Sequence, residues 1–191
     1  MLKPLLPLVF MLFYGVHPTP ECGGTLRWDN KILVDAKGLS LFSKTPKAST
    51  IHTVVGYTRP PIEQLRTNRG TIESKKVTVT AFLIGLGEED NDQDYHLILC
   101  SLNFKDSMIA EIPDPTCKKL ENFIGLRERY TAARDFITTE IDETPGSIHF
   151  LPEPVKVKVT GFLFFDKMAH GNGHARNGIE IHPVLKIWKV D

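Results

Sequence analysis

The sequence has few cysteines, no excess of charge of either sign and no common catalytic motif. Its 191 residues include three cysteines, Cys22, Cys100 and Cys117, and 23 basic against 23 acidic side chains. Three cysteines leave one unpaired if a disulfide forms, and the lack of a CxxC or Cys/His ligand spacing excludes a zinc knuckle. Because its net charge is zero, the protein lacks the long-range positive potential expected of a dedicated duplex-binding protein.

The missing motifs exclude several enzyme classes. The chain contains no Walker loop, no GxGxxG, no HExxH and no GxSxG, the patterns of nucleotide-binding, zinc-protease and serine-hydrolase sites. With 14 glycines and 13 prolines the composition is ordinary, which excludes collagen and bulk disorder. The length suits one domain, with or without an irregular flank, that buries a real core.

The amino terminus has the pattern of a secretory signal. Residues 1–16 contain one positive charge, Lys3, followed by a run of Leu, Val, Phe and Met. The run is too short, and too interrupted by Pro4 and Pro7, to cross ~30 Å of hydrocarbon. It predicts a signal peptide over residues 1–20 and export to the periplasm or the extracellular space. We expect no transmembrane segment after signal removal.

Residues 21–70 lack a sustained hydrophobic period and predict an irregular N-terminal flank. Two short segments, 31–35 and 50–56, have enough apolar residues to be strands. The dipeptide Pro60-Pro61 then favours an extended chain.

From residue 71 the pattern is mostly β. Alternating and β-branched residues predict five strands, and a 3.6-residue apolar period predicts one helix between the third and fourth. Asp114 and Pro115 suit the N-cap and first position of that helix. The predicted strands are 76–84, 95–101, 108–112, 155–165 and 178–188, and the helix ends before Thr144-Pro145-Gly146.

This order, β-β-β-α-β-β, is that of an OB-fold, so residues 71–191 predict an OB-fold-like five-stranded Greek-key barrel. Segments 76–84 and 156–164 are near copies, as expected if they are neighbours in a closed sheet. Gly161 suits a tight bend, and Pro183 predicts an open edge or a bulge in the last strand. An open α+β sandwich with the same strands is the alternative.

Several short sequence motifs, separated along the chain, resemble those of a family of exported bacterial proteins of unknown function. They are Asp94-Tyr-His-Leu, the stretch 108–117 (MIAEIPDPTC), the stretch 161–171 with FLFFD and His170-Gly, and the stretch 177–184 (NGIEIHPV). The resemblance covers about residues 70–190 and implies export, without an activity or a catalytic residue. The strand plan is also loosely similar to small periplasmic OB-fold proteins and to anticodon-binding OB domains.

Side-chain alternation predicts a cluster of acidic and imidazole groups on one outer face of the barrel. Glu180 and His182 share a face of the last strand, His96 shares a face of the second strand with Asp94, and Glu111 projects from the third. Clustered carboxylates and imidazoles are candidate catalytic or metal-binding groups. Cross-strand pairing on a solvated face is the alternative.

The segment before the last strand predicts a ligand-binding loop. Glycines let backbone N–H groups approach a ligand, and an arginine fork suits phosphate or carboxylate. A flexible surface loop is the alternative. The candidate ligand-binding residues are Tyr95, His170, His174, Arg176 and Asn177, and the candidate metal ligands are His170, His174 and His182.

Two function classes follow from these patterns. The first is an exported binding module for an oligonucleotide, another anionic polymer or a protein partner. The second is a metal-dependent hydrolase or nuclease that uses Glu111, His96, Glu180 and His182. The sequence requires no cofactor, and a divalent metal is the one these residues would take. The basic residues Arg66, Arg69, Lys75 and Lys76 would strengthen a nucleic-acid function only if they lie beside a groove of outward-facing aromatic residues. The candidates for that groove are Tyr95, Phe82, Phe162, Phe164 and Trp188.

Overall fold

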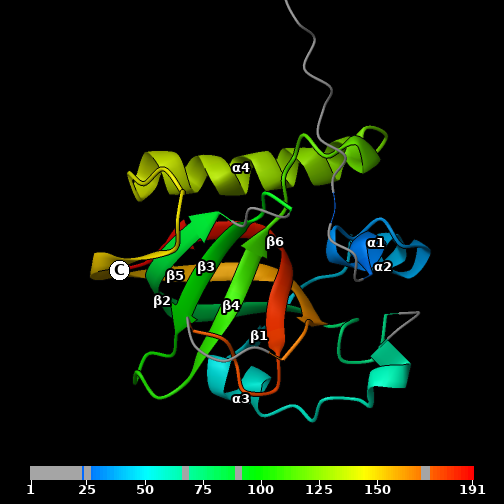
Figure 1. The fold of residues 1–191 in the computed structure, drawn as a ribbon, viewed down its shortest axis with the longest axis horizontal. Coiled ribbons are helices and arrows are strands. Elements are labelled where there is room, and N and C mark those ends of the chain that lie inside the picture. Colours follow the sequence, from blue (N-terminus) through cyan, green and yellow to red (C-terminus); the bar gives the residue numbers. More distant parts are fainter. Residues whose placement is uncertain (1–22, 24–26, 66–68, 89–91, 169–172) are drawn as a thin grey trace, which may run out of the picture.

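The structure is a computed structural model that describes residues 23, 27–65, 69–88, 92–168 and 173–191 (Figure 1). Its helical elements are α1 (Trp28–Lys31), α2 (Ala36–Leu41), α3 (Ile51–Val55), α4 (Ile124–Glu140) and the 3-10 turns η1 (Ile62–Leu65) and η2 (Lys118–Leu120). Its strands are β1 (Lys47–Ser49), β2 (Lys76–Glu88), β3 (Tyr95–Cys100), β4 (Ser107–Ile112), β5 (His149–Phe165) and β6 (Ile179–Lys189).

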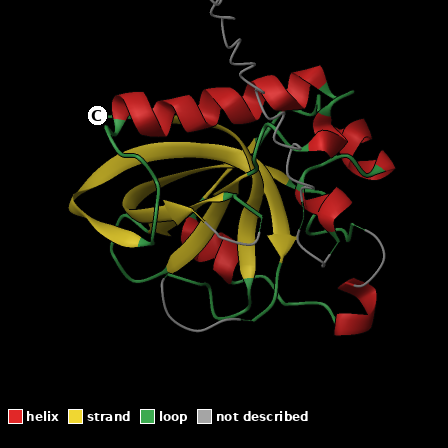
Figure 2. Ribbon diagram, turned by 45° about the horizontal axis from the view of Figure 1, so that its top comes forward, coloured by secondary structure: helices red, strands yellow, loops and turns green. Residues whose placement is uncertain are grey.

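The strands form one mixed six-stranded sheet that curves back on itself (Figure 2). The order is β1-β2-β3-β4-β6-β5, and β5 pairs with β2 as well. The β2–β5 ladder is antiparallel and runs from Lys76↔Phe162 to Leu86↔His149. The predicted pairing of segments 76–84 and 156–164 is therefore confirmed, and the fold is mostly β as expected.

The ring of strand pairings has one weak seam, between β4 and β6. These strands run parallel and share a single pair, Ala110↔Ile181. Their neighbours pair over longer ladders, six pairs for β3–β4 and eight for β5–β6. With this seam, and with the parallel strand β1 added at the edge, the sheet is not a clean five-stranded barrel.

The β5–β6 ladder is irregular at Gly161 and Pro183, as the sequence predicts. The register shifts between Thr160 and Gly161 and again between Gly161 and Leu163. A Cβ at Gly161 would lie 2.3 Å from the carbonyl oxygen of Pro183. Because Pro183 has no N–H to donate, the strand is irregular where the ladder would need one.

Helix α4 lies across one end of the sheet, and α3 lies near the other end (Figures 1 and 2). Helix α4 buries Leu126, Tyr130, Ala133 and Ile137 at the predicted 3.6-residue spacing. The side chains on the inner face of the strands join this apolar stripe in one core.

The predicted helix start is wrong. Helix α4 begins at Ile124, after the short turn η2. Asp114 instead accepts hydrogen bonds from the backbone N–H and the hydroxyl of Thr116, at 2.9 and 2.7 Å. This local turn takes the place of an N-cap.

The two strands predicted in the N-terminal flank are also wrong. Segment 31–35 ends α1 and turns at Leu33, whose φ is 63°, a left-handed conformation that no strand accommodates. Segment 50–56 is α3, because the Thr50 hydroxyl accepts a hydrogen bond from the N–H of Thr53 at 3.1 Å and caps the helix. The flank is therefore built of short helices and one strand, and it packs on the sheet.

Cys117 is disulfide-bonded, whereas Cys100 is free and buried. Cys22 and the predicted signal peptide, residues 1–20, lie outside the described residues. Among the helices that the structure describes, none combines the length and hydropathy needed to cross a membrane.

Candidate functional site

Strands β3, β4 and β6 bring the predicted acidic and imidazole residues together. His96 and Glu111 are partners in the β3–β4 ladder, and Glu180 and His182 flank Ile181, the β6 residue of the β4–β6 seam. Their neighbours Leu97, Ala110 and Ile181 point into the core. Alternation therefore places the four side chains on the outer face, as predicted.

His182 is the centre of this group. Its Nδ1 lies 2.6 Å from Glu111 Oε2 and 3.2 Å from Glu180 Oε1. Its Nε2 lies 3.1 Å from Asp94 Oδ2. His96 Nδ1 lies 3.2 Å from Glu111 Oε1. Both ring nitrogens of His182 thus face carboxylates, an arrangement that stabilises the imidazolium form.

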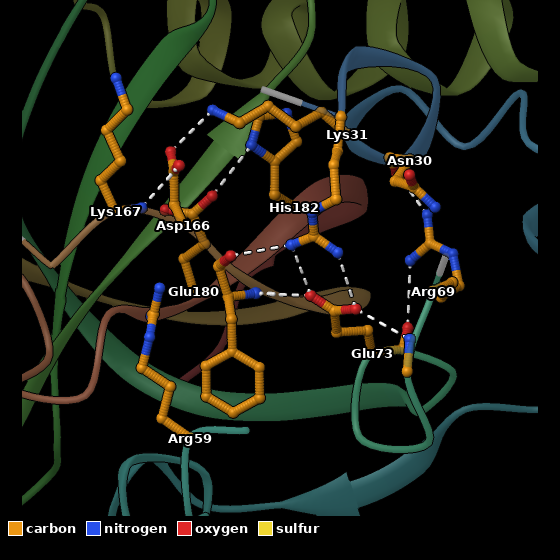
Figure 3. Close-up of polar contacts among 12 residues, drawn as sticks. Asn30, Lys31, Arg59, Arg69, Glu73, Asp166, Lys167, Glu180 and His182 are labelled. Carbon is orange, nitrogen blue, oxygen red and sulfur yellow. Dashed lines mark hydrogen bonds and ion pairs between the residues drawn. The ribbon is translucent and has the colours of Figure 1, made fainter. Parts of the chain in front are cut away.

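Two further residues complete the group, and Figure 3 shows them beside Glu180 and His182. The ammonium group of Lys31, at the end of α1, lies 2.8 Å from Asp166 Oδ2 and 3.6 Å from Glu111 Oε2. We call the whole set the buried charge cluster. Its members are Lys31, Asp94, His96, Glu111, Asp166, Glu180 and His182.

The cations of the cluster are held charged by their neighbours. Burial alone would lower the pKa of Lys31, but the charges of Glu111, Glu180 and Asp166 raise it above its ordinary value. Burial would also lower the pKa of His182, yet the three carboxylates around it raise that pKa well above the usual range. With no ion bound in the cluster, Lys31 and His182 therefore both favour their cationic forms.

The carboxyl groups of the cluster differ from one another. Burial raises the pKa of Asp94 to about 6, against the opposing effect of His182. Burial and the charge of Glu111 raise the pKa of Glu180 to about 7. For Glu111, the charge of His182 and the close contacts with His182 and His96 outweigh burial and lower the pKa well below the ordinary value. Glu111 is thus the permanent anion, and Glu180 and Asp94 hold protons more readily.

The alternative of cross-strand pairing on a solvated face is right about the pairing, since His96 and Glu111 face each other across β3 and β4, but wrong about the solvent. Asp94 and His182 are 0% exposed, His96 is 1%, and Glu180 and Glu111 are 4% and 6%. The helix α1 covers this face, and the segment from Gly173 onward packs on it, with a Cβ at Gly173 only 2.2 Å from the Ile98 side chain.

Sequence reasoning left Lys31, Asp94 and Asp166 out of the cluster. Asp94 is placed on the same face as His96 by alternation, so the signal for it is present in the sequence. Lys31 is distant in sequence and lies in a segment predicted as a strand. No local pattern connects it to β4 or β6.

A second buried ion network lies beside the cluster (Figure 3). Arg27 donates two hydrogen bonds to Glu73, at 2.8 and 3.0 Å. Glu73 also accepts from the backbone N–H groups of Phe165 and Gly70, at 3.0 and 2.9 Å. Arg69 donates to the carbonyl of Glu73 at 3.0 Å. This network has its charges paired and anchors the N-terminal flank on β5.

The candidate residues of the predicted ligand loop are not brought together as one site. The Asn177 amide donates to the carbonyls of Val55 and Tyr57, at 3.1 and 2.8 Å, so it ties the loop to α3. The ring of Tyr95 packs under the Arg134 guanidinium at 4.0 Å.

Of the other loop candidates, His174 is half-buried and its ring centroid lies 5.5 Å from that of His96. Burial, followed by the charge of His96, lowers the pKa of His174. Arg176 is exposed. The prediction for His170 falls outside the described residues.

A separate feature, which sequence reasoning did not identify, is a pair of hollows, one beside β1 and β2 and the other between β2 and β6. They have volumes of about 340 and 420 Å³ and share Lys76. We call them together the basic groove. Its cations are Lys44, Lys47, Lys75, Lys76, Arg129 and Lys186, and its aromatic residues are Phe42, Tyr57 and Trp188.

No described acidic residue neutralises the charges of the basic groove. None of the described residues that line the groove is acidic. Within the described part of the chain, none of its six cations is in an ion pair. Burial and the charge of Arg129 lower the pKa of Lys76. Like charges gathered without counterions are typical of an anion-binding surface.

Lysines lie over the aromatic rings of the groove. Lys186 Nζ is 4.7 Å from the ring centroid of Trp188, and Lys75 and Lys76 are each 5.6 Å from the rings of Tyr57 and Phe42. Of the basic cluster predicted before the first strand, Lys75 and Lys76 thus lie beside aromatic rings. Arg69 is buried and paired with Asp35, and Arg66 lies outside the described residues.

Comparisons with known proteins give distant structural likenesses only. No family model matches the chain, and no curated protein matches it. It is similar to OBody AM3L09 bound to hen egg-white lysozyme, with a TM-score of 0.43 and 9% identity over 78% of this chain and 98% of that one. For OBody AM2EP06, also bound to lysozyme, the TM-score is 0.36 with 13% identity over 61% and 80% of the two chains.

A third likeness is to an aspartyl-tRNA synthetase from Leishmania major Friedlin. Its TM-score is 0.37, with 12% identity over 76% of this chain and 21% of that chain. At such TM-scores none of the three likenesses carries an argument about function.

Proposed function

We propose that the protein is an exported binding module, built on an OB-like barrel, that holds an anionic polymer in the basic groove. The ligand that best fits the groove is single-stranded nucleic acid. The observation that carries the proposal is the groove itself, with six cations, three aromatic side chains and no acidic residue among its described lining.

The strand order supports the OB-like assignment. The strands β2, β3, β4, β6 and β5 follow one another in the sheet, and β5 returns to β2. This neighbour order, with a helix between β4 and β5, is that of the five-stranded Greek-key barrel of OB-folds. Members of that class bind oligonucleotides and oligosaccharides on their strand faces and loops.

The chemistry of the groove supports a polyanion. Lys44, Lys47 and Lys186 are exposed, so they can reach a phosphate backbone without a change in the core. Each contact to a phosphate releases condensed counterions, which gives affinity without base specificity. The half-buried rings of Tyr57 and Trp188 offer faces on which bases can stack once a lysine is displaced.

Burial disfavours the hydrolase alternative. A phosphodiester must touch the groups that cleave it, yet His96, Glu111, Glu180 and His182 are each at most 6% exposed. We therefore assign polymer binding to the exposed groove and do not assign catalysis to the cluster.

Export is supported by two features of the chain. The first is the apolar pattern of residues 1–16. The second is the disulfide at Cys117, because disulfides form and persist in oxidising compartments.

The test is a salt titration of binding to a fluorescein-labelled oligothymidylate of about 16 nucleotides, followed by anisotropy. If all six cations contact phosphates, log Kd should rise with log salt with a slope of up to about 4, from about 0.7 per contact. Arg129→Glu and Lys186→Glu should each weaken binding at least about tenfold at about 50 mM salt, and less at about 200 mM.

Lys105→Glu is the matched control, because Lys105 is exposed in the β3–β4 turn, outside the groove. It should bind as the wild type does. Absence of binding at about 50 mM salt, or an equal loss in the control variant, would contradict the proposal.

A further inference from the structure

The seam between β4 and β6 lies directly beneath the buried charge cluster. The single pair that joins the strands is Ala110↔Ile181. Glu111 and His182 each follow one member of that pair, and their side chains meet on the outer face at 2.6 Å. The side chains thus supply a connection where the backbone ladder supplies very little.

Three residues of the cluster lie close enough together to hold a metal ion. Asp94, Glu111 and His182 offer ligand atoms that lie within 4.8 Å of one another. They come from the start of β3, from β4 and from β6, so an ion among them would hold three strands. All three are buried.

Unsatisfied atoms point to a missing partner at the same place. Asp94 Oδ2, Glu111 Oε2 and His182 Nε2 are buried and have no hydrogen-bond partner among the described residues. Their ion-pair contacts lack hydrogen-bond geometry. Since buried polar atoms are nearly always satisfied, three such atoms in one cluster require an explanation.

The cluster also contains more carboxyl groups than basic groups. Asp94, Glu111, Asp166 and Glu180 provide four carboxyl groups, whereas Lys31, His96 and His182 supply at most three positive charges. Buried carboxylates in excess of cations are costly unless they are protonated or bind a cation. A divalent ion would remove the excess.

The groups around the three candidate ligands hold them in place. The backbone N–H of Asp114 donates to Asp94 Oδ1 at 3.1 Å. His96 Nδ1 lies 3.2 Å from Glu111 Oε1. Such outer contacts orient metal ligands, and each leaves the other oxygen of its carboxylate directed toward His182.

We propose that Asp94, Glu111 and His182 form a buried structural site for a divalent transition-metal ion, which clamps β3, β4 and β6 at the seam. Two carboxylates and one imidazole are a mixed oxygen and nitrogen set that suits Mn²⁺ or Zn²⁺ better than Ca²⁺. Three protein ligands leave room for a further ligand on the ion, but the burial of all three keeps a substrate away from it and favours a structural role. This proposal is independent of polymer binding in the basic groove.

The experiment uses the full chain, stripped with EDTA and titrated with Mn²⁺, with free Mn²⁺ followed by electron paramagnetic resonance. One Mn²⁺ should bind per chain and be displaced by Zn²⁺. Mn²⁺ should also raise the thermal midpoint and slow amide exchange in β4 and β6, because an ion that binds only the folded state stabilises it.

Asp94→Asn and Glu111→Gln should each weaken Mn²⁺ binding at least about tenfold and abolish the thermal shift. Asp35→Asn is the control: it makes the same change in a carboxylate paired with Arg69, and Asn still caps α2. It should bind Mn²⁺ like the wild type. Lys31→Met should bind Mn²⁺ several-fold more tightly, because the ammonium competes for Glu111.

Two results would overturn the proposal. One is the absence of saturable Mn²⁺ and Zn²⁺ binding by the stripped, folded wild-type chain. The other is unchanged binding in folded Asp94→Asn and Glu111→Gln variants, with folding checked by circular dichroism. Either result would leave the cluster as an ion network that Lys31 and His182 neutralise alone.

Discussion

At Gly161 two strands approach each other too closely for a side chain. A Cβ there would lie 2.3 Å from the carbonyl oxygen of Pro183 and 2.4 Å from Cγ2 of Ile181. Neither neighbour is the free end of a flexible side chain, so β5 and β6 would have to move apart. Gly161 is thus the residue that permits the irregular β5–β6 ladder.

We predict that Gly161→Ala lowers the free energy of unfolding by about 1–3 kcal/mol, as overpacking does in other cores. Urea unfolding followed by circular dichroism measures the change. Gly146→Ala is the control, because a Cβ at Gly146 meets nothing within 4 Å, and it should change stability by less than about 0.5 kcal/mol. Equal stability of the two variants would contradict this account of the bend.

The sequence pattern predicted several members of the buried charge cluster, but it did not predict that the cluster is buried. Alternation in β3 and β6 was enough to place His96, Glu180 and His182 on one face. Their burial depends on Lys31 and its helix, which come from a remote part of the chain. A local pattern contains no information on that contact.

At the scale of elements, one buried hydroxyl ties the end of α1 to α4. Tyr130 is 0% exposed, and its hydroxyl donates to the carbonyl of Ile32 at 2.8 Å. Ile32 follows α1 directly, so this bond fixes the position of the helix that carries Lys31 over the cluster.

We predict that Tyr130→Phe lowers the free energy of unfolding by about 1 kcal/mol, through loss of that hydrogen bond. Amide exchange in residues 28–33 should become faster than in the wild type. Tyr57→Phe is the control, because it also removes a phenolic hydroxyl, but one that makes no hydrogen bond with the described part of the chain. It should leave amide exchange in residues 28–33 unchanged. Equal exchange in both variants would show that the hydroxyl does not hold α1.

Long elements were predictable and short ones were not. The strands 76–84 and 155–165 have enough alternation to be placed, and their near identity correctly indicated that they pair. Helices α1 and α3 have four and five residues, fewer than are needed for a 3.6-residue period to be recognised. Their conformations depend on the cap at Thr50 and the turn at Leu33.

The basic groove was not predicted because its lining is assembled from six or more separate parts of the chain. Lys75 and Lys76 are adjacent in sequence and indicated a local basic cluster. Arg129 from α4 and Lys186 from β6 join them only in the folded molecule. The net charge of zero gave no sign of a basic surface, because the positive and negative side chains are mixed along the sequence and separate only in the folded molecule.

At the scale of the whole molecule, the disulfide at Cys117 links the segment before α4 to another part of the chain. Reduction with a phosphine should lower the free energy of unfolding by about 2–4 kcal/mol, the usual effect of losing a disulfide. Urea unfolding with and without reductant measures the difference.

Two cysteine variants make this prediction specific. Cys117→Ser should show no response to reductant, because its disulfide is already absent. Cys100 is free, so Cys100→Ser should lose stability on reduction as much as the wild type does. A reductant effect that persists in Cys117→Ser would contradict the assignment.

Two of the cations that neutralise buried carboxylates of the folded protein come from the N-terminal flank. Lys31 and Arg27 precede residue 71, yet they neutralise Glu111 of β4 and Glu73 of the turn before β2. A fragment beginning at residue 71 would keep the anions and lose both cations. The smallest piece expected to fold autonomously therefore starts upstream of Arg27, and an expression boundary drawn where the strand pattern begins would separate the barrel from its own charge compensation.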